Sequence, residues 1–209
     1  MRYKSAQILE YENEITRPAR FTQETLGWVP WLAPIPEEEL TQGQREALID
    51  DFRIKRPYFR LLVRNAAALE ARTLTDKDIF QNEEGGLPLE DRELAATAAS
   101  RLNGCVYCAS VHSRKASHYS GRKAEIQQLL DEGADADLDP RWSAISHAAQ
   151  LLTRSPLEFG PDQVSELYRV GLDESEIVDL VYSASFFNWA NRLMLALGEP
   201  EVLSRRRRS

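Results

Sequence analysis

Apolar side chains recur at helical spacing through most of the chain after residue 40, and no alternating pattern long enough for a β-strand interrupts them. Between Leu89 and Leu102, for example, Leu94, Ala98 and Leu102 fall on one side of a helix. Glycines, prolines and capping residues separate such stretches from one another. The pattern predicts helices over residues 57–74, 89–102, 105–119, 122–131, 140–153, 161–169 and 173–197, and hence an all-α fold.

The first 40 residues do not follow this pattern. Four prolines between positions 18 and 36 interrupt the apolar segment around Trp28 and Trp31, so a long helix is excluded there. We expect residues 1–40 to form an irregular N-terminal arm whose aromatic side chains cover the protein's own core or a neighbouring subunit. Residues 41–198 are predicted to form a single all-α domain, followed by a basic C-terminal tail over residues 199–209.

The composition is that of an ordinary globular protein. Of the 209 residues, 43% are hydrophobic and 28% are charged, which suffices for one well-buried domain. The net charge of −7 argues against nucleic acid as the main partner, and the arginines at 205–208 are expected to form a solvated tail. No stretch approaches the roughly 20 apolar residues of a membrane span. We therefore expect a cytoplasmic protein that contacts neither nucleic acid nor membrane.

Nearly all the nucleophilic chemistry of the chain lies within one short segment. Cys105 and Cys108 are its two cysteines, and His112 is one of its three histidines. In a helix the two cysteines share one face with Cα atoms about 5 Å apart, which a disulfide can bridge. His112 follows one turn later on that face, where an imidazole can take a proton from a thiol. The spacing therefore predicts a redox-active dithiol site.

The start of this helix affects the two cysteines differently. Asn103 and Gly104 can end one helix and open the next, which leaves Cys105 in the first turn, where free backbone N–H groups lower a thiol pKa. Cys108 instead gains from His112. These two effects leave open which cysteine is the nucleophile.

Other interpretations of the two cysteines fit the sequence less well. Two cysteines and a histidine are one ligand short of a structural zinc site, and the chain has no second CxxC. Haem attachment needs a histidine directly after the second cysteine, where this chain has Ala109. The remaining alternative is that both cysteines are packing residues of a buried helix. We therefore expect neither a metal nor an organic cofactor.

A glutamate, Glu93, lies twelve residues before Cys105 and completes a larger motif with Cys108 and His112. The motif resembles the redox-active branch of the alkylhydroperoxidase D (AhpD)-like, or carboxymuconolactone decarboxylase-like, superfamily. The similarity extends from about residue 61 to residue 121, and residues 186–192 resemble the late helix of the peroxidase-related proteins. The resemblance implies an AhpD-like helical bundle.

The resemblance also implies roles for these residues. Cys108 would attack a hydroperoxide, Cys105 would resolve the product as a disulfide, and Glu93 with His112 would move protons. The reducing partner would be an external dithiol donor, lipoyl or thioredoxin-like. The best-known members have a histidine where this chain has Tyr107, which we expect to line the pocket. Members assemble as dimers, trimers or hexamers, and a homo-oligomer is expected here as well, with apolar surface from residues 186–189.

Two other functions fit the same chain. A carboxymuconolactone decarboxylase-like lyase would use acid and base residues, but it does not need the two cysteines. A redox sensor or disulfide-exchange protein would use them to change a binding surface. Aligning residues 91–108 with 174–191 places Asn188 opposite Cys105 and Asn191 opposite Cys108. A degenerate repeat and convergent amphipathic patterning explain this alignment equally well.

Overall fold

The computed structural model describes residues 8–9, 15–84 and 86–203, and in these ranges it is a helical bundle with one small sheet. The predicted all-α class is confirmed. No helix in the described ranges is long and apolar enough to cross a membrane. The helices are α1 (Gln42–Leu48), α2 (Asp51–Ile54), α3 (Pro57–Leu62), α4 (Ala66–Gln81), α5 (Leu89–Leu102), α6 (Val106–Ser120), α7 (Lys123–Glu132), α8 (Pro140–Thr153), α9 (Pro161–Arg169) and α10 (Glu174–Leu197), with short 3-10 turns at Glu37–Glu39 and Gly133–Asp135.

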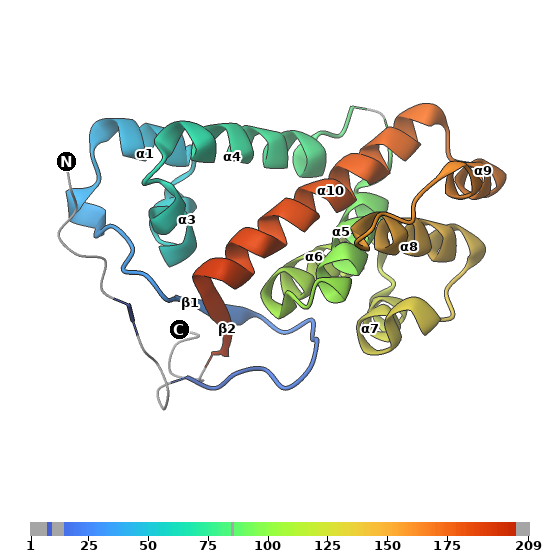
Figure 1. Ribbon diagram of the computed structural model, residues 1–209, viewed down its shortest axis with the longest axis horizontal. Helices are drawn as coiled ribbons and strands as arrows, with labels where there is room; N and C mark the ends of the chain where they lie inside the picture. The colour runs from blue at the N-terminus through green and yellow to red at the C-terminus, as the bar shows by residue number, and fades with distance from the viewer. Residues whose placement is uncertain (1–7, 10–14, 85, 204–209) are drawn as a thin grey trace.

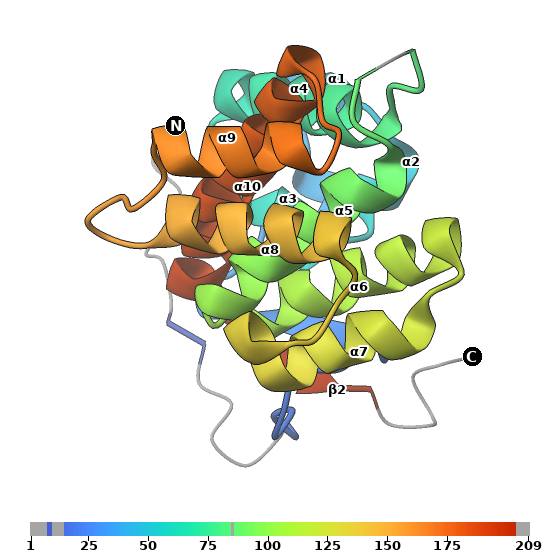
Figure 2. The same ribbon diagram turned by 90° about the vertical axis from the view of Figure 1, so that its right-hand side faces the viewer.

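Helix α5 is the centre of the bundle. It packs against α6, α8 and α10, and the long helix α10 crosses it diagonally (Figures 1 and 2). Every residue from Asp91 to Ser100 is buried. Ala95, Ala96 and Ala99 are small enough for neighbouring helices to approach closely. A polar side chain on α5 is therefore held inside the protein, away from water.

The ends of several helices match the sequence prediction because their signals are local. Pro140 opens α8 after Asp139, whose carboxylate accepts hydrogen bonds from two backbone N–H groups of the first turn. Asp173 and Glu176 form a capping box at the start of α10. Gly121 ends α6 with φ 73°, a conformation that favours glycine.

The predicted helix over residues 57–74 is divided in the structure. Helix α3 ends at Leu62 and α4 begins at Ala66, after Asn65 caps it by accepting a hydrogen bond from the Ala68 N–H. The break lets α1, α3 and α4 enclose a second apolar cluster beside the main core (Figure 1). Its buried members are Ile35, Leu40, Ala47, Leu48, Val63 and Leu69.

A two-stranded antiparallel sheet was not predicted from the sequence. Strand β1 (Leu26–Pro30) pairs with β2 (Gly198–Val202), so the expected irregular arm and the first residues of the expected basic tail are joined. Gly198 is needed here, because a Cβ atom would lie 2.3 Å from the Val29 carbonyl oxygen. The division of the chain into arm, bundle and tail remains a prediction, and the arginines at 205–208 lie outside the described residues.

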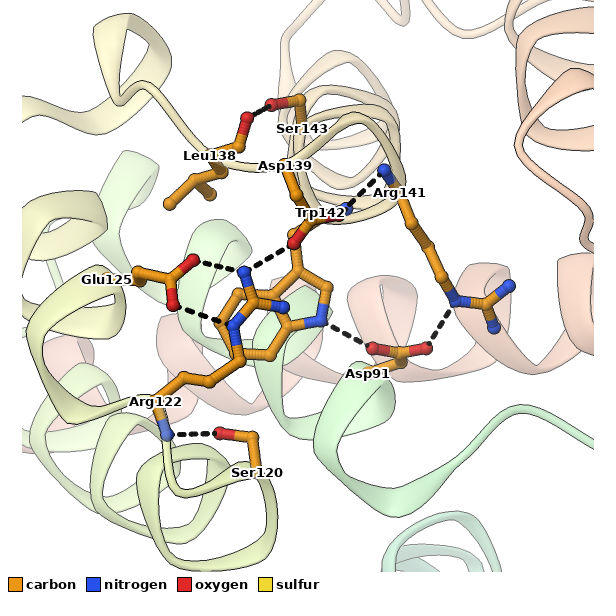
Figure 3. A network of polar contacts seen from close by, with 9 residues as sticks. All are labelled: Asp91, Ser120, Arg122, Glu125, Leu138, Asp139, Arg141, Trp142 and Ser143. Carbon is orange, nitrogen blue, oxygen red and sulfur yellow. Dashed lines mark hydrogen bonds and ion pairs between the residues drawn. The ribbon is translucent and has the colours of Figure 1, made fainter.

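A polar network built around the buried Asp91 joins α5 to α8 (Figure 3). Asp91 accepts hydrogen bonds from Trp142 Nε1 at 2.8 Å and from Arg141 Nε at 3.0 Å. Arg122 lies 3.6 Å from the centre of the Trp142 ring and pairs with the carboxylates of Glu125 and Asp139. Because Asp91 is buried, these partners compensate for its removal from water. The network anchors the α5 segment that carries Glu93.

Candidate functional site

The two cysteines lie at the turn between α5 and α6. Gly104, with φ 76°, makes that turn, and Cys105 is the residue before the first turn of α6. Both thiols are free, and Cys105 and Cys108 are only 1% and 4% exposed. The structure therefore places Cys105 at a helix N-terminus, as the sequence predicted.

The two thiols interact and divide their protons unequally. The Cys108 thiol, its backbone amide and the Asn191 side chain lower the pKa of Cys105 below its usual value, against the effect of burial. Contact with Cys105 and burial raise the pKa of Cys108 well above the ordinary value. The two thiols therefore titrate as an interacting pair, with a first ionisation that is easier and a second that is harder than for an ordinary thiol.

Glu93 and His112 form a buried pair across α5 and α6. A Glu93 carboxylate oxygen contacts Nδ1 of His112, and the other carboxylate oxygen lies 3.1 Å from Nζ of Lys115. Glu93 is fully buried, whereas the Lys115 side chain is 41% exposed. The Phe187 ring packs on the imidazole with 4.0 Å between ring centres. The carboxylate therefore fixes the imidazole orientation, and Lys115 connects this pair to the surface.

Asn191 on α10 is a site residue that the motif did not reveal. It is fully buried, accepts a hydrogen bond from Asn103 at 3.0 Å and donates one to Ser100 at 3.1 Å. Its side chain also lowers the pKa of both thiols. The alignment of Asn191 with Cys108 was the only signal in the sequence, and the structure brings both residues together.

The three aromatic residues at positions 186–189 of α10 are not all exposed to solvent. Phe186 and Phe187 are 6% and 3% exposed and pack inside, so the expected apolar surface at residues 186–189 comes from Trp189 alone, which is 47% exposed. Tyr107 is partly buried against the main core, and its pKa is raised chiefly by burial. His118 and His147, the other two histidines of the chain, are exposed.

No cluster of three or more His, Cys, Asp or Glu side chains that could hold a metal ion is found in the described part of the chain. The groups assembled at the site are instead two thiols, one imidazole, one carboxylate and one amide. Such a set can transfer protons and exchange a thiol pair for a disulfide.

The structure thus combines a helical bundle, a dithiol at the start of one helix and a buried Glu–His pair. Residues 66–151 match the carboxymuconolactone decarboxylase family. This match, together with the fold, confirms the resemblance to the AhpD-like superfamily that the sequence predicted. The uncharacterized protein YdfG of Bacillus subtilis is 28% identical over 107 residues, which cover 51% of this chain and 73% of YdfG.

Solved structures show the same fold. A peroxidase-related protein from Silicibacter sp. TM1040 aligns with TM-score 0.66 and 23% identity, over 91% of this chain and 96% of that protein. A peroxidase-related protein with an alkylhydroperoxidase AhpD core, from Ralstonia eutropha JMP134, also gives 0.66, with 21% identity over 78% and 88%. A variant of the debrominase Bmp8 in complex with 2,3,4-tribromopyrrole gives 0.59, with 17% identity over 78% and 87%. Because all three sequence identities are below 25%, these similarities show that the fold is shared and nothing further.

Proposed function

We propose that the protein is a thiol-dependent hydroperoxide reductase in which Cys108 attacks the peroxide and Cys105 resolves the product. The observation that carries this proposal is the buried Glu93–His112 pair beside a dithiol whose two thiols have opposite pKa shifts. A site with a nucleophile, a resolving thiol and a base suits two-electron peroxide reduction.

In the first step Cys108 loses its proton and attacks. Its raised pKa makes a base necessary, and His112, one turn along α6, accepts the proton while Glu93 stabilises the imidazolium. A sulfur–oxygen bond forms, the oxygen–oxygen bond breaks, and the leaving oxygen takes the proton to give an alcohol or water. Sulfur is oxidised to the sulfenic acid and the peroxide is reduced.

In the second step Cys105 attacks the Cys108 sulfenic acid. By this step the Cys108 thiol that chiefly lowers the pKa of Cys105 has been oxidised, but the Cys108 backbone and the Asn191 side chain still lower that pKa and favour the thiolate that the step requires. A sulfur–sulfur bond forms, the sulfur–oxygen bond of the sulfenic acid breaks, and the hydroxide leaves as water after it takes up the proton that Cys105 released. An external dithiol, lipoyl or thioredoxin-like, then donates two electrons and two protons and becomes a disulfide itself. A thiol of low pKa is also a good leaving group, so attack on the Cys108 sulfur releases Cys105 readily.

The test is peroxide consumption by the full chain with dithiothreitol as the dithiol. Wild type should turn over repeatedly, Cys108→Ser should not turn over, and Cys105→Ser should form one sulfenic acid per chain and then stop. Cys108→Ser is close in size and keeps the helix start, so its loss of activity would not reflect misfolding. If Cys108→Ser consumes peroxide as fast as wild type, the assignment is wrong.

A redox sensor is the second candidate, and Asn191 favours it. Asn191 joins the thiols to α10, whose outer face exposes Val178, Tyr182 and Trp189. Disulfide formation removes the thiol contacts of Asn191 and would thereby alter α10. A sensor would be oxidised once by peroxide, show no turnover with dithiothreitol, and change the fluorescence of Trp189.

A carboxymuconolactone decarboxylase-like lyase is the further alternative. Its activity would survive replacement of both cysteines by serine.

A further inference from the structure

Two buried hydrogen-bond donors near the thiols have no partner within the part of the chain that the structure describes. They are the hydroxyl of Tyr58 on α3 and Nε of Arg72 on α4, and the two residues are 5% and 7% exposed. A buried donor without an acceptor lowers stability, so such groups in a folded protein call for an explanation. Neither residue belongs to the motif that carried the proposed function.

Both donors pack on the same ring: the Tyr58 ring lies 5.2 Å from the Phe59 ring centre, and the Arg72 guanidinium lies 5.7 Å from it. Tyr58 is a member of the same core cluster as Cys105 and Cys108. Burial chiefly raises the pKa of Tyr58, the charge of Arg72 opposes this rise, and negative charge on either cysteine adds to it. The charge of Arg72 also lowers the pKa of Cys108. A charge on one of these groups is therefore felt by the others.

Aromatic rings fix the position of Arg72 relative to the Glu93–His112 pair. Its guanidinium lies 4.9 Å from the centre of the Phe186 ring, and Phe186 packs against Phe187 with 5.6 Å between centres. Phe187 in turn packs on His112 at 4.0 Å. These contacts connect Arg72 to His112 through two packed rings.

A second buried arginine serves as a comparison. Arg53 also has an unpartnered Nε within the described ranges, but its guanidinium pairs with Asp50 and, at 3.7 Å, with Asp76. The charge of Arg53 does not contribute to the pKa shift of Cys105 or of Cys108. Within the described ranges Arg72 makes one ion pair, 3.4 Å to Asp76, and its charge lowers the pKa of Cys108. The two arginines therefore differ: Arg53 pairs with two carboxylates, whereas Arg72 pairs with one and its charge acts on Cys108.

We propose that the Tyr58 hydroxyl and the Arg72 guanidinium form an oxygen-binding subsite that holds the leaving oxygen of a hydroperoxide during attack by Cys108. The inference rests on the proposed function. As the sulfur–oxygen bond forms and the oxygen–oxygen bond breaks, negative charge develops on the leaving oxygen, and fixed donors in a buried site stabilise such charge strongly. His112 supplies the proton, and Tyr58 keeps its own throughout, as its raised pKa requires.

Tyr58→Phe is the sharpest test, because it removes only an unpartnered hydroxyl. The rate of sulfenic acid formation by the reduced full chain should be measured with hydrogen peroxide and with cumene hydroperoxide. We expect a fall of about 10²-fold, and folding that is as stable as in wild type or more so. Arg72→Lys keeps the charge but loses Nε and should slow the reaction as well. Tyr168→Phe, on the exposed side of α9, is the matched control and should react like wild type.

Alkylation of Cys108 by iodoacetamide, measured in a Cys105→Ser background, separates a subsite from an effect on the thiol itself, because that reaction has no leaving oxygen. In this background Tyr58→Phe should be alkylated as fast as the chain that keeps Tyr58. If Tyr58→Phe slowed alkylation and peroxide reduction by the same factor, the proposed subsite would be overturned. Peroxide reduction within twofold of wild type would overturn it too, and would leave the proposed function intact. A wild-type chain that does not reduce peroxide at all would overturn the proposed function and the subsite together.

Discussion

The carboxylate of Glu93, fully buried on α5, contacts Nδ1 of His112 on α6. This contact fixes the orientation of the imidazole and leaves its Nε2 as the ring nitrogen available for proton transfer. Lys115 lies 3.1 Å from the second carboxylate oxygen and is partly exposed. One buried acid therefore links the interior base to a cation at the surface.

Removing either member of this pair should slow peroxide reduction. Glu93→Gln keeps the shape but loses the charge that stabilises an imidazolium, and His112→Ala removes the base. We expect each to lower the rate of sulfenic acid formation by about 10²–10⁴-fold. Glu70→Gln, an exposed glutamate on α4, is the control and should not change the rate. Full activity in Glu93→Gln would rule out a role for the pair in proton transfer.

The two thiols should titrate as an interacting pair. In the reduced protein, the ultraviolet absorbance of thiolate should show a first ionisation below the ordinary value of 9.0 and a second well above it. Cys108→Ala removes the main group that lowers the pKa of Cys105, so that pKa should rise. Cys105→Ala removes the main group that raises the pKa of Cys108, so that pKa should fall. Identical titrations in the two variants and in wild type would show that the thiols do not interact.

The same shifts predict how stability depends on pH. Between the lowered pKa of Cys105 and 9.0, the unfolded chain binds more protons than the folded chain, so the stability of the reduced protein rises with pH. Above 9.0 the unfolded chain has lost the Cys108 proton that the folded chain keeps, so stability falls. Urea unfolding across this range should show the maximum in the reduced protein. The disulfide form has no thiols to titrate and should lack it.

The Asp91 network should contribute to stability rather than to chemistry. Asp91→Asn leaves Arg141 without one of its acceptors, and we expect unfolding free energy to fall by about 1–3 kcal/mol. Urea unfolding of the oxidised protein measures it. Asp137→Asn, an exposed aspartate, should change stability by less than about 0.5 kcal/mol. An unchanged midpoint in Asp91→Asn would show that the network adds no stability.

We predict that the protein is a homo-oligomer that uses the outer face of α10. Val178, Tyr182 and Trp189 on this helix are 50%, 59% and 47% exposed, more apolar surface than one isolated helix face usually leaves to water. Sedimentation at micromolar concentration should show species heavier than 23.8 kDa. Trp189→Glu should shift the distribution toward the monomer. A single wild-type species near 23.8 kDa would contradict the prediction.

The sequence by itself determined the features that depend on near neighbours along the chain. The bounds of α5, α8 and α9 agree with the prediction, because periodicity, caps and proline at the first helical position act within a few residues. The place of Cys105 at the start of α6, with Cys108 and His112 after it, follows from the same local signals. So does the absence of a long helix among the described residues before Gln42.

Only the tertiary structure decided which distant side chains complete the site. Asn191 and Phe187 come from α10, and Tyr58 and Arg72 come from α3 and α4, so their positions depend on the angles at which the helices cross. The pairing of β1 with β2 likewise joins segments from opposite ends of the chain. In the sequence these residues look like any others on amphipathic helices, because a helical pattern states which face is buried but not which face it meets.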